Sequence, residues 1–134
     1  MQTLYHVVLL SDCLEDPSTA AWLVHAGVSL PGEIPSGRYP TPAELQAVID
    51  AIPGIRAVYT ISDAIWQVTV TSRSDVFWAT LAVREYAGDP DTAHPFYFIA
   101  GWDELIQLIT SHLATRCGPL VLLHDSGALP QVVM

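Results

Sequence analysis

The two-residue period of the side chains in segments 65–71 and 76–86 constrains the fold of this chain most. Within residues 65–71, large apolar side chains occupy every second position, at Trp66, Val68 and Val70. The segment 76–86 repeats the pattern, with Phe77, Ala79, Leu81 and Val83 on one face and Trp78, Thr80, Ala82 and Arg84 on the other. A period of two is typical of antiparallel strands that have one buried and one solvated face.

Two other segments have helical periodicity. Thr41-Pro42-Ala43-Glu44 has the pattern of a capping box, with proline at the first helical position. An apolar stripe follows it at Leu45, Val48, Ile49 and Ile52. The segment 102–116 predicts a second main helix, with Leu105, Leu108, Ile109, His112 and Leu113 on one face. A shorter helix is expected over 20–26, with a start signal at Asp16-Pro17-Ser18 and Gly27 closing it.

Short apolar runs complete the expected sheet. Strands are predicted at 4–10, 57–62, 96–100, 120–123 and 131–133, and the first ends at a turn formed by Ser11-Asp12. The pattern therefore predicts an α+β domain, with an antiparallel or mixed sheet of five to seven strands and two main helices packed on one face.

The length indicates a single globular domain over residues 1–134. Residues 27–42 form an irregular segment rich in proline and glycine, too long for a simple connection. Its apolar residues Val28, Leu30, Ile34 and Tyr39 favour packing of this segment against the domain.

The charge balance excludes several classes of partner. The chain has no lysine, five arginines and 14 acidic residues, for a formal charge of −9, although only 14% of its residues are charged and 51% are hydrophobic. An acidic protein without a basic patch is repelled by nucleic acid and by anionic membranes, and we expect neither as a partner. No apolar run reaches the length of a bilayer span. We expect a cytoplasmic protein in which Cys13 and Cys117, which could pair or stay free, are free thiols by default.

Two clusters raise the question of chemistry. His112, Cys117 and His124 are zinc-ligand types, but their spacing matches no standard site and they fall short of four ligands. His124-Asp125-Ser126 contains a base, a carboxylate and a nucleophile, yet triad partners are normally brought together by the fold, and Asp-Ser-Gly favours a turn. We therefore predict no catalytic residue, no metal site and no cofactor.

The first functional hypothesis is a non-catalytic protein-interaction domain that forms a homodimer. The low charged fraction and the apolar excess suit a self-complementary interface. The acidic balance also suits a basic protein partner such as a nuclease toxin, by analogy with small acidic immunity proteins. A related hypothesis is a structural subunit of a larger assembly, in which the same apolar surface contacts different chains.

The alternative is a small-ligand-binding protein or an enzyme with a pocket between the sheet and segment 27–42. Aromatic contacts in such a pocket are predicted from Tyr39, Trp66 and Trp78, of which the two tryptophans are placed on one surface of the sheet. Its polar groups are predicted to be His124 and Asp125.

Overall fold

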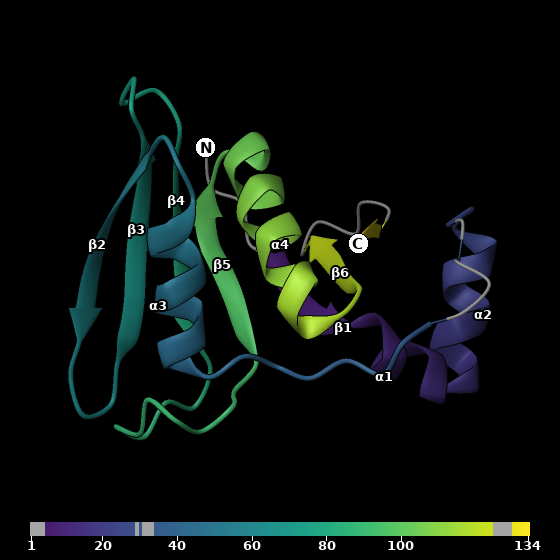
Figure 1. Cartoon of the computed structure of the whole chain (residues 1–134). Coiled ribbons are helices and arrows are strands. Elements are labelled where there is room, and N and C mark those ends of the chain that lie inside the picture. Colours follow the sequence, from purple (N-terminus) through teal and green to yellow (C-terminus); the bar gives the residue numbers. More distant parts are fainter. Residues whose placement is uncertain (1–4, 29, 31–33, 125–129) are drawn as a thin grey trace.

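The computed structural model describes residues 5–28, 30, 34–124 and 130–134. The elements in chain order are β1 (Tyr5–Leu9), α1 (Leu10–Glu15), α2 (Pro17–His25), α3 (Pro42–Ala51), β2 (Ile55–Ile61), β3 (Trp66–Ser72), β4 (Trp78–Val83), β5 (Phe96–Gly101), α4 (Asp103–Cys117), β6 (Leu120–His124) and β7 (Gln131–Val133). Figure 1 shows their arrangement.

Within the described residues, the strands form one seven-stranded antiparallel sheet in the order β2-β3-β4-β5-β1-β6-β7. Strands β2 to β5 form a meander, and β1 then inserts between β5 and β6. Opposite the pair Thr80 and Leu81, strand β5 carries one extra residue, Ile99, which forms a β-bulge. The predicted α+β class with a sheet of up to seven strands is confirmed.

Helices α3 and α4 lie side by side on one face of the sheet (Figure 1). They bury their apolar stripes against the inward-facing residues of the strands, with Leu45 and Ile49 from α3 and Ile106 and Ile109 from α4 almost fully buried. The predicted packing of two main helices on one face is therefore confirmed. We call this side of the sheet the helix side.

A second, smaller core lies on the opposite face, next to β1, β6 and β7. It contains Leu10 and Cys13 from α1, Leu23 from α2 and Val121 from β6. Neighbouring residues in β6 alternate between the two cores, because Leu120 and Leu122 belong to the helix-side core. Helices α1 and α2 thus cover only the β1–β6–β7 part of this second face.

The far side of β2 to β5 is not packed under any described helix. We call it the uncovered face, and its strand residues are Arg56, Val58, Thr60, Gln67, Thr69, Thr71, Trp78, Thr80, Ala82, Tyr97 and Ala100. The cross-strand registers align them in rows, such as Thr60, Gln67, Ala82 and Tyr97. The predicted assignment of Trp78, Thr80 and Ala82 to one face of their strand agrees with this arrangement.

Local side-chain contacts explain why two helices begin where they do. The Glu44 N–H donates to Thr41 Oγ1 and the Thr41 N–H donates to Glu44 Oε1, both at 3.1 Å, so the predicted capping box of α3 is confirmed. Asp16 caps α2 by accepting from the Ser18 N–H at 3.1 Å. Gly27 follows α2 with a φ of 79°, the left-handed conformation expected there.

The turn predicted at Ser11-Asp12 is wrong. These two residues lie in α1, which begins at Leu10 without a side-chain cap. The helix forms because it buries Leu10 and Cys13 in the second core, and tertiary burial outweighs the turn preference of Ser-Asp.

The longest helix of the described chain, α4, has 15 residues. No helix in the described ranges is long and apolar enough to cross a membrane.

Candidate functional sites

The structure separates the two tryptophans that were predicted to share a surface. Trp66 is 2% exposed and points into the helix-side core, where its ring meets that of Tyr59 edge-on, with centroids 5.6 Å apart. Trp78 is paired with Thr71 and therefore lies on the uncovered face. The placement of both rings on one surface is wrong, because the β3–β4 register sets Trp78 level with a solvated residue of β3.

Tyr39 and His124, two other residues of the predicted ligand site, lie in different parts of the structure. Tyr39, in the irregular segment, packs half-buried against the helix-side core, and burial raises the pKa of its phenol. His124 meets Tyr5 edge-on at 4.9 Å between ring centroids. Asp125 lies outside the described residues. The four described members of the predicted ligand site are therefore not gathered around one cavity.

The contacts of Tyr5 define a small polar cluster where α4 begins. Its hydroxyl donates to Asp103 Oδ1 at 3.2 Å, and burial together with the Asp103 carboxylate raises the pKa of Tyr5. A phenol with a raised pKa stays protonated at neutral pH, so it acts as a hydrogen-bond donor and not as a base. This cluster is suited to fixing α4 against β1.

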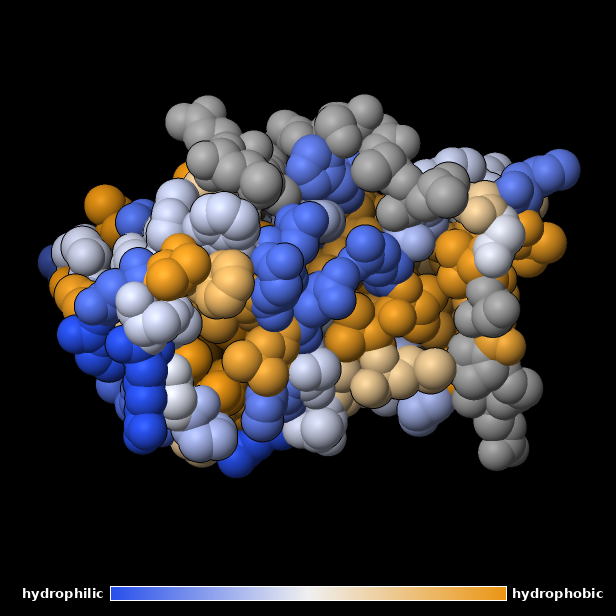
Figure 2. All heavy atoms as spheres, turned by 90° about the horizontal axis from the view of Figure 1, so that it is seen from above, coloured by the Kyte–Doolittle hydropathy of each residue, from blue (hydrophilic) through white to orange (hydrophobic). Residues whose placement is uncertain are grey.

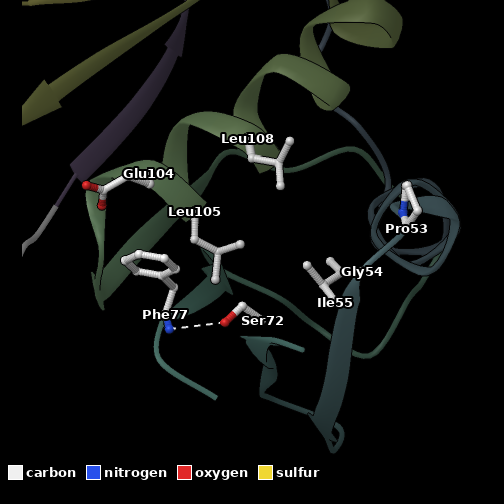
Figure 3. Close-up of a pocket in the computed structure, with 8 residues that line it drawn as sticks. All are labelled: Pro53, Gly54, Ile55, Ser72, Phe77, Glu104, Leu105 and Leu108. Atoms are coloured by element: carbon white, nitrogen blue, oxygen red, sulfur yellow. Dashed lines mark hydrogen bonds between the residues drawn. The ribbon is translucent and has the colours of Figure 1, made fainter. Parts of the chain in front are cut away.

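A hollow of about 170 Å³ lies between the C-terminal end of α3 and the first turns of α4 (Figure 3). It is lined by Pro53, Gly54, Ile55, Ser72, Phe77, Glu104, Leu105 and Leu108. Among these, Glu104 carries the one charge. A similar volume holds a benzene-sized molecule in other proteins. None of the four described residues of the predicted ligand site lines it.

Two contacts shape this hollow. The Phe77 N–H donates to Ser72 Oγ at 3.1 Å, the dashed line in Figure 3, which holds the start of β4 in place. The ring of Phe77 also meets Trp102 edge-on, with centroids 5.5 Å apart. Figure 2 views the molecule from this end and shows hydrophobic and hydrophilic residues intermixed on the surface. The hollow is thus an open, largely apolar depression, and Figure 3 shows the Glu104 carboxylate directed away from Leu105 and Leu108.

The outer edge of β2 is a second candidate site. The strand has seven residues and pairs along its whole length with β3, and no other described strand lies beside it. Arg56 is its one charged residue, and it contains no proline. Val58 is 69% exposed and Ile61 48% exposed. Sequence patterns locate such a strand but do not show that it lies at an edge, because strand order depends on long-range pairing.

The third candidate is a cationic cluster formed by Arg84, Tyr97 and His6. The Arg84 guanidinium carbon lies 4.4 Å from the centroid of the Tyr97 ring, and Arg84 Nη2 contacts His6 Nδ1. Arg84 and His6 were not predicted as site residues. The alternation pattern placed Arg84 on the face of Trp78, but it carries no information on contacts with β1.

Comparisons with known proteins do not assign this chain to a family. No protein-family model, curated protein or solved structure matches it.

Proposed function

We propose that this chain is a non-catalytic protein-interaction domain that forms a homodimer through the edge of β2. The observation that supports the proposal is the outer edge of β2, which pairs with no described strand and is seven residues long with one charge and no proline. Natural sheets normally protect such edges with lysine, proline, bulges or a covering element, because unpaired backbone groups bind other strands. The opposite edge strand, β7, has only three residues. The sheet therefore offers one long edge for pairing.

The hydrogen bonds of β2 show which backbone groups are available. The Arg73 N–H donates to the Gly54 carbonyl at 3.1 Å, and the Ser62 N–H donates to the Ile65 carbonyl at 2.8 Å. The backbone N–H and C=O groups of the even-numbered residues in 54–62 therefore point towards β3. Because bonding direction alternates along an antiparallel strand, Ile55, Ala57, Tyr59 and Ile61 direct their N–H and C=O groups outward. A second strand can bond to all four.

A second copy of β2 fits this edge in one full-length register. A two-fold axis at Val58 pairs Ile55 with the partner's Ile61 and Ala57 with the partner's Tyr59. All outward-facing residues then lie in hydrogen-bonded pairs, each with two backbone bonds. Val58 meets its own copy in a non-hydrogen-bonded pair, where side chains approach most closely. The register leaves no outward-facing amide of β2 without a partner.

The charges of the edge permit this pairing. In the Val58-centred register, Arg56 lies opposite the partner's Thr60, so no like charges face each other. Arg56 is also paired with Asp75 of its own chain. The net charge of −9 still repels two copies at long range. Since salt screens that repulsion, with a Debye length of about 10 Å at 0.1 M, the dimer should tighten as salt is raised.

The experiment is a measurement of mass by light scattering over about 1 to 500 µM protein, a range that brackets micromolar affinities. Val58→Lys places two cations beside each other at the axis, and should yield monomers where the wild type is dimeric. Val76→Lys is the matched control, because Val76 is 56% exposed and lies outside β2. A monomeric wild type at every concentration would contradict the homodimer, and a dimeric Val58→Lys would contradict the β2 interface.

A cross-link tests the register separately. Val58→Cys brings two sulfurs together at the axis, because the Cα atoms of a non-hydrogen-bonded pair lie about 4.5 Å apart, within disulfide range. Oxidation should give a covalent dimer. Thr60→Cys, two residues away on the same face, is the control and should cross-link poorly. Equal yields from both variants would argue for a different register.

The hollow beside α4 supports a second candidate function, the binding of a small apolar ligand. Its largely apolar walls suit a hydrophobic group. Leu108→Arg should block it, because Leu108 is 39% exposed at its wall. Native mass spectrometry of the purified protein should show added mass that this variant lacks. A wild-type mass equal to that of the bare chain argues against this function.

A basic protein partner is a further proposal that rests on the net charge alone. Carboxylates of α3 and α4 such as Asp50, Asp103 and Glu104 are exposed. The uncovered face carries no acidic strand residue among those described. A basic partner should therefore contact an acidic helical surface, either that of α3 and α4 or that of α1, where Asp12 and Glu15 are exposed. Neither surface overlaps the outer edge of β2, so both kinds of association can be tested on one protein.

A further inference from the structure

Arg84 lies at the boundary between the part of the second face that α1 and α2 cover and the uncovered face. Val8 of β1 packs into the second core, whereas His6, two residues earlier on the same face, lies beside Tyr97 of β5. Tyr97 is in turn paired with Ala82 of β4. Arg84 follows β4, and its N–H donates to the Pro95 carbonyl at 2.8 Å. Three adjacent strands thus bring a cation, a phenol ring and an imidazole together.

The contacts of this cluster fix the roles of its polar atoms. A guanidinium group has five N–H donors and no acceptor. His6 Nδ1 must therefore accept from Arg84 Nη2, which leaves the ring proton on Nε2 as a donor. The Arg84 guanidinium also lies over the face of the Tyr97 ring in a cation–π contact. The remaining guanidinium N–H groups and His6 Nε2 are donors that an anion can use.

Arg84 forms no ion pair with a carboxylate of the described residues. Arg38 is paired with Glu44 and Arg56 with Asp75. No described carboxylate lies within ion-pair distance of Arg73, Arg84 or Arg116. Of these three, Arg73 and Arg116 are exposed, whereas Arg84 is half-buried. A half-buried cation without a carboxylate is unexpected in a chain with 14 acidic residues.

We propose that Arg84, held by His6 and Tyr97, binds a carboxylate group of a ligand or partner at the margin of the uncovered face. A planar carboxylate matches the fork of a guanidinium in a bidentate pair. The cluster carries one positive charge, which balances a carboxylate but not a phosphate dianion. The strand residues of the uncovered face include no Asp or Glu among those described, and the exposed Glu85, next to Arg84 in the sequence, forms no ion pair with it.

Arginine side-chain NMR tests this proposal on the intact chain. Five arginines give five Nε–H signals, and Arg84→Lys identifies the signal of Arg84 by its loss. Sodium succinate, added at constant ionic strength, should shift the Arg84 signal along a saturating curve, with a dissociation constant on the order of millimolar. The signals of Arg73 and Arg116 should shift linearly and by less. Arg84→Gln should abolish the accompanying shift of the His6 ring signals.

A capped peptide with one glutamate, titrated in the same way, distinguishes a protein carboxylate from a small acid. Saturation at lower peptide than succinate concentration assigns the carboxylate to a protein, and the reverse order assigns it to a small molecule. The proposal is overturned if Arg84 responds like Arg116 in both titrations. It is also overturned if inorganic phosphate saturates the Arg84 signal and the carboxylates do not.

Discussion

Glu44 is the residue whose charge we expect to matter most for stability. Its carboxylate accepts from Arg38 Nη1 at 2.8 Å, from Arg38 Nη2 at 2.5 Å and from the Thr41 N–H at 3.1 Å. These bonds, above all those from Arg38, lower the pKa of Glu44 from 4.5 to about 2. A shift of this size corresponds to about 3 kcal/mol. Because the Arg38 side chain is 59% exposed, solvent screening reduces the expected contribution to about 1–2 kcal/mol.

The perturbation is Glu44→Gln, measured by urea unfolding between about pH 7 and pH 2. Glutamine can still accept from the Thr41 N–H, so the variant removes the charge and keeps the capping box. A depressed pKa in the folded state stabilises the protein above the unfolded-state pKa. The free energy of unfolding should therefore be lower in the variant by about 1–2 kcal/mol at neutral pH. This difference should shrink as the pH falls from 4.5 towards 2, with more than half of it lost by about pH 3.

Subtracting the variant from the wild type cancels the titration of the other carboxylates, which also affects acid stability. Glu15→Gln, at an exposed position in α1, is the matched control and should change the free energy of unfolding by less than about 0.5 kcal/mol. The reasoning is refuted if Glu44→Gln is as stable as the wild type at pH 7. It is equally refuted if the difference stays constant down to pH 2.

Two further predictions concern backbone and thiol groups. Gly101 has a φ of 151°, and a Cβ there would lie 2.6 Å from Ala79 Cα, so Gly101→Ala should lower the free energy of unfolding by about 2–5 kcal/mol in urea titrations. Gly27→Ala, where a Cβ meets nothing within 4 Å, should cost less, and a reversed order would contradict the steric argument. Burial raises the pKa of Cys117 to about 11, so its thiol should react with a disulfide reagent at about pH 8 only after denaturation. A rapid reaction of folded Cys13→Ser protein, in which Cys117 is the remaining thiol, would disprove this.

The parts of the fold that could be predicted have local causes. The capping box at Thr41 and Glu44 requires only residues three apart, and it sets the start of α3 correctly. Alternation within one strand likewise predicts which residues share a face. The predicted strand at 57–62 lies within two residues of β2 at each end, because the apolar–polar pattern fades gradually at strand termini.

The parts that could not be predicted depend on long-range pairing. Helix α1 has no capping side chain, so nothing near Leu10 in the sequence indicates a helix start. The faces of Trp66 and Trp78 could be compared only once the register between β3 and β4 was known. The contact between Arg84 and His6 joins residues 78 positions apart. The candidate carboxylate site therefore leaves no motif in the sequence.

The central position of β1 has a consequence for how the chain folds during synthesis. Tyr5 bonds to a residue 98 positions later, and the strands on both sides of β1 come from the second half of the chain. At a synthesis rate of about 5–20 residues per second, roughly 5–20 s pass between the synthesis of β1 and that of its partner strands. Meanwhile the meander of β2 to β5 can form through local hairpins, which close quickly. Strand β1 is therefore made long before both of its neighbours and placed late, and its pairing joins the two parts of the sheet.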